Sequence, residues 1–375
     1  MAALYIHIPL CASRCFYCDF YSTTFRDKQE ALTDGICKEM NLRKDYLQNE
    51  PVNTIYFGGG TPSLLPVKEI GKMVEAAFRL FNCNLQEMTI EANPDDLAPQ
   101  YVRELQNLPF NRISIGIQSF NDHELKRLNR RHTSGQAIDA VRTCQEAGFD
   151  NISIDLIYGL PGQTILQWEE NLQIAVDLQV PHISAYHLSY EKGTELFRQW
   201  QQGQIAQVEE SVSEAMFKLV RKKLQDNEYQ QYEISNFAKP GMKSQHNSAY
   251  WNGIPYIGLG PSAHSYNRHT RQWNVADLTV YLNALENEDI FYETEKLNFN
   301  DQYNEFIITS LRKTEGMEME LLKEKFGKER YAYCLQHAAG FIATGLLEAC
   351  SDRLRLSEKG IFVSNNIMAE LLWVE

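Results

Sequence analysis

The sequence predicts an α/β protein in which a partial (β/α)6 barrel is followed by an α+β extension and a small winged-helix-like module. Up to about residue 190, short apolar or β-branched runs alternate with helical stretches, which is the pattern of parallel βα units. The alternation stops there, and from about residue 297 three helical stretches precede a hairpin-like pattern. We therefore expect domains at residues 1–200, 201–296 and 297–375.

Six short runs are expected to form the strands of the parallel sheet. They are residues 4–8, 54–57, 88–92, 112–117, 151–157 and 182–188. Amphipathic helical stretches such as 67–81 and 134–147 lie between them. Six units are too few for a closed eight-unit barrel, so the barrel should be open. Ligands of parallel βα folds bind at the carboxyl ends of the strands, so the residues after each run are the site candidates.

The extension should begin with a helix over residues 207–225 and a strand over 230–234. The C-terminal module should end in a hairpin made of residues 346–349 and 353–356. Winged-helix modules often bind DNA, but residues 297–375 contain 9 basic and 12 acidic residues, a net charge of −3. We therefore expect no nucleic-acid partner and interpret the module as a docking or lid surface.

The composition is that of a globular protein. The 375 residues are 43% hydrophobic, and 36 Lys plus Arg against 49 Asp plus Glu give a net charge of −13, which disfavours nucleic acids and anionic lipids as partners. No apolar run reaches the ~20 residues that span a bilayer, and no leader pattern precedes the first strand, so cytoplasmic residence is expected. Five of the eight cysteines are scattered, as ordinary small apolar residues would be.

Three cysteines follow the first predicted strand in a Cys-x-x-x-Cys-x-x-Cys run, at Cys11, Cys15 and Cys18. A cuboidal iron–sulfur cluster takes four thiolates, one for each iron, and this run supplies three. Position 20, where a fourth thiolate could extend the run, is Phe20. One iron of a [4Fe-4S] cluster would therefore stay open to chelate S-adenosylmethionine (SAM) through its amino and carboxylate groups.

Two other interpretations of the cysteine run remain open. A structural zinc site needs four closed ligands, and the nearest histidine, His7, lies on the first predicted strand. A disulfide-linked loop is the second alternative. The spacing favours the cluster over both.

Polar residues and glycines follow the predicted strands, where a ligand would bind. The loop Gly58-Gly-Gly-Thr-Pro-Ser63 has three residues without Cβ atoms, which allow the backbone to approach a small charged ligand. The polar candidates at the other strand ends are Glu91, Gln118, Asp155, Tyr186 and His187, together with Arg130, whose guanidinium could reach back over the barrel mouth. Each of these features alone is equally compatible with a solvated rim residue or a plain glycine turn.

Four segments resemble those of a known family. They are Tyr5-Ile-His-Ile-Pro-Leu-Cys11 with the two later cysteines, Gly58-Gly-Gly-Thr-Pro-Ser63, Arg112-Ile-Ser-Ile-Gly-Ile-Gln-Ser-Phe120 and Ile154-Asp-Leu-Ile-Tyr-Gly-Leu-Pro161. Over nearly the whole chain the sequence resembles the oxygen-independent coproporphyrinogen III dehydrogenase (HemN) family of radical SAM proteins. Within that family it looks closest to the heme chaperone branch.

The resemblance implies a set of site residues by position. Cys11, Cys15 and Cys18 would hold the [4Fe-4S] cluster. The first SAM would be lined by Tyr5, Gly59 and Glu91. In the dehydrogenase a second SAM is contacted by residues that match Tyr17, Gly60, Thr61, Gln118, Arg130, Asp155 and Tyr186.

Two departures from the dehydrogenase pattern favour the heme chaperone branch. The dehydrogenase has another cysteine two positions after the third cluster cysteine, where this sequence has Phe20, and it has a long N-terminal arm over its active site. Only ten residues precede Cys11. Without the arm, less of the chain encloses a tetrapyrrole and excludes water from a radical.

The segment His246-Asn-Ser-Ala-Tyr250-Trp251 is a candidate heme site. A histidine can ligate heme iron, and Tyr and Trp offer flat faces for a porphyrin. By itself the segment is more typical of a hydrogen-bonded surface histidine in a loop, beside core aromatic residues. The pattern resembles the segment associated with heme binding in the heme chaperone branch.

The loop Gly258-Leu-Gly-Pro-Ser-Ala263 has the spacing of a dinucleotide fingerprint, which we reject. Pro261 lies inside it, no βαβ unit surrounds it and no acidic residue follows at the required distance. The resemblance places this loop near the adenosyl group of SAM, with His264 as its neighbour. A buried turn is the alternative.

Three functions are compatible with these observations. The first is a heme carrier that delivers heme to apo-hemoproteins, including membrane-bound respiratory enzymes. The second is an enzyme that uses SAM and a low-potential electron donor to decarboxylate coproporphyrinogen III to protoporphyrinogen IX. The third is a radical SAM enzyme with another substrate. We expect the first.

Overall fold

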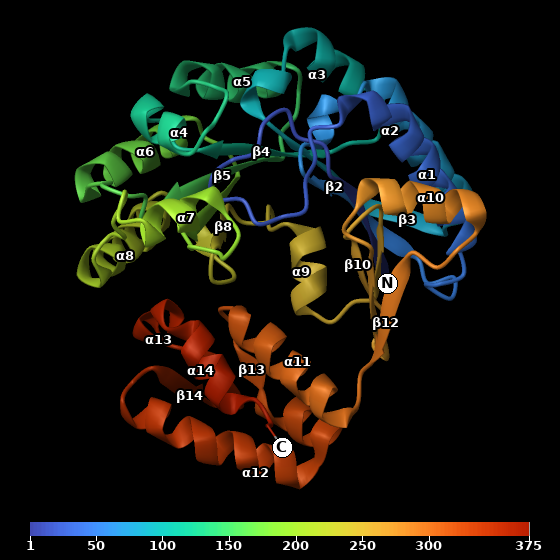
Figure 1. The fold of residues 1–375 in the computed structure, drawn as a ribbon. Helices are drawn as coiled ribbons and strands as arrows, with labels where there is room; N and C mark the ends of the chain where they lie inside the picture. Colours follow the sequence, from blue (N-terminus) through green and yellow to red (C-terminus); the bar gives the residue numbers. More distant parts are fainter. Residues whose placement is uncertain (375) are drawn as a thin grey trace.

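The computed structural model describes residues 1–374 and contains the predicted partial barrel (Figure 1). Six parallel strands lie side by side in chain order, each paired with the next. Their bounds are β1 Ala2–Ile8, β2 Val52–Gly59, β3 Cys83–Ala92, β4 Arg112–Gln118, β5 Ile152–Tyr158 and β6 His182–His187. All six predicted strands are confirmed, with ends that differ from expectation by a few residues.

Helices cover the outer face of these strands, as the amphipathic stretches predict (Figure 1). They are α1 Gln29–Leu42, α2 Val67–Leu80, α3 Pro99–Leu105, α4 Asp122–Arg127, α5 Ser134–Glu146 and α6 Ile165–Asp177, and the 3-10 turns η1 Arg26–Lys28, η2 Pro62–Leu64 and η3 Pro94–Asp96 lie in the loops. The strands β4 and β5 are buried at nearly every position because a parallel sheet is covered on both faces. No helix within residues 1–374 combines the length and apolar character needed to cross a bilayer.

The sheet continues beyond both ends of the six predicted strands. On one side β9 Tyr256–Leu259 runs parallel to β1, followed by the antiparallel strands β10 His264–Tyr266, β11 Thr270–Asn274 and β12 Tyr292–Lys296. On the other side lie β8 Asn236–Ala238 and β7 Gln230–Gln231. Within residues 1–374 these strands form one twelve-stranded sheet. The expected six strands are therefore half of the sheet.

Residues 195–251 differ from the sequence expectation in three places. The helix expected over 207–225 is α8 Glu210–Asp226, and α7 Glu195–Gln201 precedes it. The strand expected over 230–234 is limited to β7, because the chain bends at residues 234–235 and returns as β8. The segment that contains His246 forms α9 Gln245–Trp251 and not a loop. This helix contacts β1, β2 and β3 on the concave side of the sheet (Figure 1).

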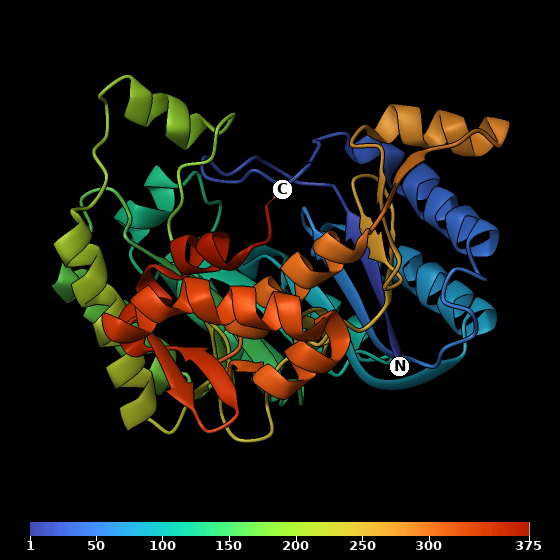
Figure 2. The same cartoon turned by 90° about the horizontal axis from the view of Figure 1, so that it is seen from below.

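The C-terminal module lies across the open side of the barrel (Figures 1 and 2). It contains α11 Phe299–Arg312, β13 Met317–Glu318, α12 Met319–Ala343, β14 Leu347–Cys350, β15 Arg353–Leu356, α13 Glu358–Phe362 and α14 Ser364–Leu371. The predicted hairpin is confirmed by β14 and β15, and β13 pairs with β15. The helix α12 is kinked at Gly327, whose φ of 79° is outside the helical region.

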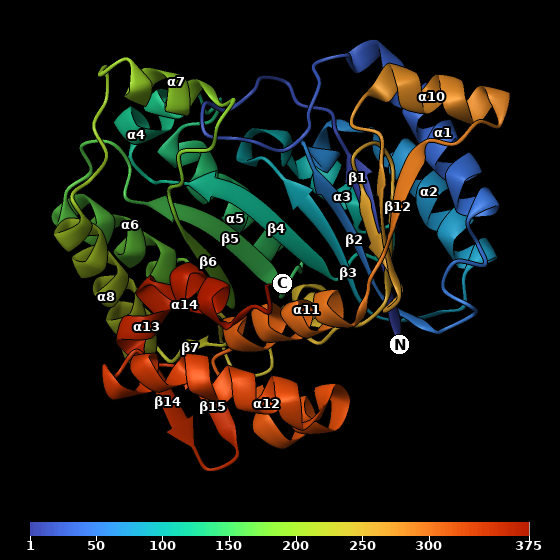
Figure 3. The same cartoon turned by 60° about the horizontal axis from the view of Figure 1, so that its bottom comes forward.

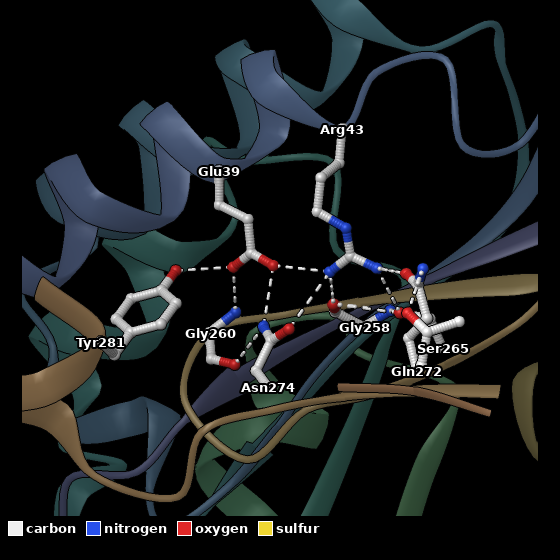
Figure 4. A network of polar contacts seen from close by, with 9 residues as sticks. Glu39, Arg43, Gly258, Gly260, Ser265, Gln272, Asn274 and Tyr281 are labelled. Atoms are coloured by element: carbon white, nitrogen blue, oxygen red, sulfur yellow. Dashed lines mark hydrogen bonds and ion pairs between the residues drawn. The ribbon is translucent and has the colours of Figure 1, made fainter. Parts of the chain in front are cut away.

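A buried polar network attaches the extended sheet to α1 (Figure 4). Glu39 and Arg43, one turn apart on α1, form a buried ion pair at 2.7 Å. Glu39 also accepts hydrogen bonds from the Gly260 N–H, from Asn274 and from Tyr281 of α10 Leu278–Asn287. Arg43 donates to the Gly258 carbonyl and to the side chains of Ser265, Gln272 and Asn274. Both buried charges are therefore fully partnered, which a buried ion pair requires.

Candidate functional site

The three predicted cluster cysteines lie on one half-buried loop directly after β1. Their thiols are free. Cys11 Sγ accepts a contact from Thr61 Oγ1 at 3.7 Å, and Cys15 Sγ accepts one from Arg130 Nη1 at 3.3 Å. Hydrogen bonds of this kind stabilise thiolates and tune the potential of a cluster bound to them. The loop therefore combines three soft ligands with donors from two other segments of the barrel.

The chemistry of the three thiols fits a metal cluster. Burial raises the pKa of Cys11, and it raises the pKa of Cys18 to about 11, with a further contribution from the neighbouring cysteines. The thiolate is the form that ligates metal, so cluster binding must release these protons. Within residues 1–374 no group of three or more His, Cys, Asp or Glu side chains is arranged to hold a single metal ion. An iron–sulfur cluster does not need ligands that converge on one ion, because each of its thiolates bonds to a separate iron.

The three glycines at the end of β2, Gly58 to Gly60, are required mainly by packing. A Cβ atom on Gly59, whose φ is 108°, would lie 2.6 Å from the His7 ring, and one on Gly60 would lie 2.8 Å from the Leu10 carbonyl oxygen. The Gly59 N–H already donates to Glu91, and the Gly60 N–H to the Ile8 carbonyl. The sequence predicted that N–H groups of this loop would be free to bind a ligand. Two of these N–H groups instead donate hydrogen bonds to residues of β1 and β3.

Glu91 lies at the carboxyl end of β3, where a parallel barrel binds its ligand. One carboxylate oxygen accepts a hydrogen bond from Tyr56 at 2.8 Å, and the other accepts from the Gly59 N–H at 3.1 Å. Burial raises the pKa of Glu91 to about 7, with Asp155 adding to the shift and these hydrogen bonds opposing it. A half-buried carboxylate that has no cation beside it within residues 1–374 is suited to accept a hydrogen bond from the amino group of a ligand.

Arg130 joins three segments at the same end of the barrel. Besides Cys15, its guanidinium donates to the Asn93 side chain and to the Gly116 carbonyl. Its Nε atom is buried and has no partner within residues 1–374. The sequence expectation that Arg130 reaches over the barrel mouth agrees with this position, and the contact with Cys15 adds a role next to the cluster ligands.

Asp155 and Gln118 lie on the neighbouring strands β5 and β4. Burial raises the pKa of Asp155, while hydrogen bonds from Ser184 and Ser114 and the charge of Arg112 oppose the shift. Gln118 has a φ of 70°, at a point where the pairing of β4 with β5 shifts register. Gln118 is therefore at the carboxyl end of β4, as Glu91 is near that of β3, whereas Asp155 lies in the middle of β5.

The remaining candidates at the strand ends are distributed differently. Thr61 accepts a hydrogen bond from Asn93, and Tyr17 packs against a small apolar cluster beside the cysteine loop. Tyr186 is 40% exposed at the end of β6. His187 donates or accepts a hydrogen bond with Ser213 of α8 at 3.0 Å, which turns it away from the barrel mouth.

His246 is buried inside the barrel, with a relative exposure of 1%. Its Nδ1 atom lies 2.8 Å from Thr54 Oγ1, and its Nε2 atom lies 2.9 Å from the Tyr250 hydroxyl. The ring stacks on Tyr56 with a centroid distance of 4.9 Å. Burial lowers the pKa of His246 to about 3, so the ring is neutral at pH 7. Both nitrogens are therefore engaged, and an iron atom would have to displace one partner.

A cavity of about 1050 Å³ lies between the barrel and the C-terminal module. This volume is at the upper end of the range of ligand pockets, ~300–1,000 Å³. Its barrel wall includes Tyr5, Asp19, Phe20, Tyr250, Trp251, His264 and Arg271, and its other wall includes Phe299, Phe306, Lys313, Lys325, Phe326 and Arg353. The cavity thus has the aromatic faces and cationic groups that a flat, anionic ligand requires.

The sequence expectation missed the wall of the cavity that the C-terminal module contributes. Its residues are common aromatic and basic side chains, most of them on α11 and α12 at helical spacing that also fits a packed core. On the barrel wall, Trp251 Nε1 and Arg271 Nε are buried donors without a partner among residues 1–374, and they are visible in the structure alone.

Comparison with known proteins gives two family matches. The model of the radical SAM superfamily matches residues 5–175, and the model of the HemN C-terminal domain matches residues 297–363. Among solved structures, coproporphyrinogen III oxidase (HemN) from Escherichia coli superposes with a TM-score of 0.86 at 22% identity, covering 99% of this chain and 90% of that one. That likeness shows the fold.

Curated relatives match over the full length. The heme chaperone HemW of Lactococcus lactis subsp. lactis is 33% identical over 370 residues, which are 98% of this chain and 96% of that protein. The heme chaperone HemW of Bacillus subtilis is 31% identical over 376 residues, 99% of each chain. The mouse protein named radical S-adenosyl methionine domain-containing protein 1, mitochondrial, is 37% identical over 70% of this chain and 60% of its own.

Proposed function

The chain belongs to the HemW family of the radical SAM superfamily, and on that premise we propose that it is a heme chaperone that binds heme and delivers it to apo-hemoproteins of the respiratory chain. Membership of the superfamily implies a [4Fe-4S] cluster and SAM. Cys11, Cys15 and Cys18 would hold the cluster, and Glu91 would accept a hydrogen bond from the amino group of SAM. When bound, these groups supply reductive cleavage of SAM.

The cavity between the barrel and the C-terminal module is the observation that best supports heme binding. Its volume of about 1050 Å³ accommodates a tetrapyrrole. Tyr250 and Trp251, the two aromatic residues of the predicted heme segment, both line it. Of the basic side chains on its walls, Arg271, Lys313 and Arg353 are already paired with Glu305, Glu315 and Glu318, so Lys325 is the one best placed to meet a carboxylate of heme.

The proposal includes residence in a reducing compartment, the cytoplasm. All eight cysteines are free thiols, five of them outside the cluster loop. Disulfides are rare where thiols are kept reduced, and an exposed cluster requires the same conditions. The recipients of heme are apo-hemoproteins, and any use of SAM requires a low-potential electron donor.

An oxygen-independent coproporphyrinogen III dehydrogenase remains the second candidate. The specific observation in its favour is that Asp19 and Phe20 of the cysteine loop line the same cavity. A tetrapyrrole there would lie beside the cluster loop, within the barrel mouth where a radical would form. Oxidative decarboxylation of the propionate groups would then be possible in geometric terms.

One experiment separates the two candidates. The protein is reconstituted anaerobically and divided between ferric heme and a mixture of coproporphyrinogen III, SAM and dithionite. We expect one heme per chain to be retained through gel filtration and then transferred to a heme-free respiratory cytochrome. Catalytic formation of protoporphyrinogen IX would overturn the carrier in favour of the dehydrogenase.

A matched pair of variants connects the heme to the cavity. Trp251→Ala removes a ring from the cavity wall and should weaken heme binding about tenfold, since an aromatic contact contributes ~0.5–1.5 kcal/mol beyond area burial. Trp200→Ala, on exposed α7, should leave binding unchanged. Equal effects of both substitutions in a heme titration would place the heme elsewhere.

A further inference from the structure

Three histidines line the cavity, and His246 is not among them. The three are His7, His264 and His269. His7 has both ring nitrogens engaged, Nδ1 with the Tyr5 hydroxyl at 3.0 Å and Nε2 with the Tyr21 carbonyl at 3.2 Å. His246 is engaged in the same way by Thr54 and Tyr250. An iron atom in the cavity therefore finds accessible imidazole nitrogens only on the other two.

His264 has an exposed ring whose nitrogens form no hydrogen bond within the described residues 1–374. Its one ring neighbour is Trp273, across the β10–β11 pair, with centroids 6.3 Å apart. Partial burial and then the charge of Arg271 lower its pKa, which keeps the imidazole neutral at pH 7. The neutral ring is the form that ligates iron.

The strand that carries His264 is held by hydrogen bonds on its face away from the cavity. Side chains alternate along a strand, so His264 and Tyr266 face the cavity while Ser265 between them faces α1. Ser265 accepts a hydrogen bond from Arg43 at 2.9 Å, as part of the network in Figure 4. This network fixes the backbone from which the His264 ring projects, while the ring itself stays free to turn toward a ligand.

His269 lacks this support. It follows Arg268, which has a φ of 75°, at the tip of the turn between β10 and β11. Arg268 is itself paired with Glu50 at 2.8 Å, toward the rim of the barrel. The ring of His269 is exposed, and it lies on a turn that the buried network does not support. A substitution of His269 is therefore the control for a substitution of His264.

We propose that His264 supplies the axial imidazole to the iron of a heme bound in this cavity, and that His246 is a positioning residue that holds Tyr250 on the cavity wall. This inference rests on the proposed heme-binding function. It places the iron ligand on β10, and it gives His264 a role other than the neighbour of the SAM adenosyl group that the resemblance implied. The aromatic residues of α9 are left to line the porphyrin. The sheet extension, and not the predicted heme segment, then provides the metal ligand.

The test is chemical rescue of the iron ligand. Wild-type protein, His264→Ala, His269→Ala and His246→Gln are each loaded with ferric heme and measured by absorption and electron paramagnetic resonance. We expect His264→Ala to lose the imidazole-ligated spectrum and to regain it when free imidazole is added. His269→Ala should keep the wild-type spectrum. His246→Gln should keep the imidazole-ligated spectrum and bind heme more weakly.

The outcomes are distinguishable. Loss of the imidazole signature in His246→Gln with rescue by free imidazole, while His264→Ala is unchanged, would assign the ligand to His246 and overturn the inference. A phenolate-type spectrum in the wild type that is insensitive to His264→Ala would also overturn it, since five cavity residues are tyrosines: Tyr5, Tyr21, Tyr250, Tyr256 and Tyr266. Failure of the wild type to retain heme would overturn the proposed function itself.

Discussion

Glu91 illustrates at the residue scale how burial prepares a group for a charged ligand. Its carboxyl is held by Tyr56 and the Gly59 N–H, with no basic side chain recorded beside it in residues 1–374. A cationic ligand would therefore neutralise a charge that burial makes costly. The sequence could predict Glu91 because it ends a strand of a parallel barrel. It could not predict the pKa, which depends on Tyr56 and Asp155 from other strands.

The raised pKa of Glu91, about 7, makes SAM binding pH dependent. The carboxylate accepts a hydrogen bond from the SAM amino group more strongly when it is ionised, so affinity should rise as the pH increases from 6 to about 7.5. The amino group binds iron through its lone pair and is then neutral, so the loss of its proton near pH ~8 should not lower the affinity again. Equilibrium dialysis of SAM with cluster-loaded protein measures this profile.

The control for this prediction is Glu91→Gln, which keeps the size of the side chain and removes its titration. Its affinity for SAM should be weaker at pH 7.5 and lack the rising limb between pH 6 and 7.5. A wild-type profile that is flat in that interval would show that Glu91 does not contact the amino group of SAM.

At the element scale, strands buried on both faces were predictable and the strands of the extension were not. Runs such as Ile152–Tyr158 are apolar at almost every position, which marks a central parallel strand. In contrast, β11 Thr270–Asn274 contains Arg271, Gln272 and Asn274, which resemble a polar loop. These side chains become acceptable in a strand because Arg43 and Glu39, more than 200 residues away in sequence, partner two of them.

Arg43→Met should therefore destabilise the protein far more than loss of a surface charge. The substitution leaves the Glu39 carboxylate buried without its cation, and breaking a buried pair in this way costs ~3–5 kcal/mol. Chemical denaturation under anaerobic conditions, followed by circular dichroism, measures the free energy of unfolding.

Lys72→Met is the matched control. Lys72 is 33% exposed in its ion pairs with Glu30, Asp34 and Glu69, and exposed ion pairs contribute little to stability. Equal losses would mean that the network is not required for folding.

The same dependence on distant partners limited the site prediction. The cysteine spacing is local, so it could be recognised in the chain alone. The burial of His246 depends on Thr54 and Tyr56 of β2, about 190 residues earlier, and no pattern around His246 indicates it. For the same reason α9 was expected as a loop, since its seven residues are too few for a helical period to be recognised.

At the scale of the whole molecule, the C-terminal module lies across the open side of the barrel (Figure 3) and contributes one wall of the cavity. The helices α11 and α12 contribute aromatic and basic residues opposite α9 and β10. The expected docking or lid role remains a prediction, and the position of the module agrees with it. A ligand bound in the cavity would contact both parts of the chain, so its affinity should depend on side chains from each.

Lys325 provides the test of that dependence. It lines the cavity from the first part of α12, packs over the Phe306 ring at 5.3 Å, and has no carboxylate partner within residues 1–374. Lys325→Glu should weaken ferric heme binding about fivefold or more, because an exposed charge pair with a propionate contributes up to ~1 kcal/mol and reversal adds repulsion. Raising the salt concentration should reduce the difference in heme affinity between the variant and the wild type.

Lys328→Glu is the control, because it makes the same charge change on the same helix but outside the cavity wall. If both variants bind heme equally well in a fluorescence-quenching titration, the module does not contact the ligand, and the heme must be held by the barrel alone.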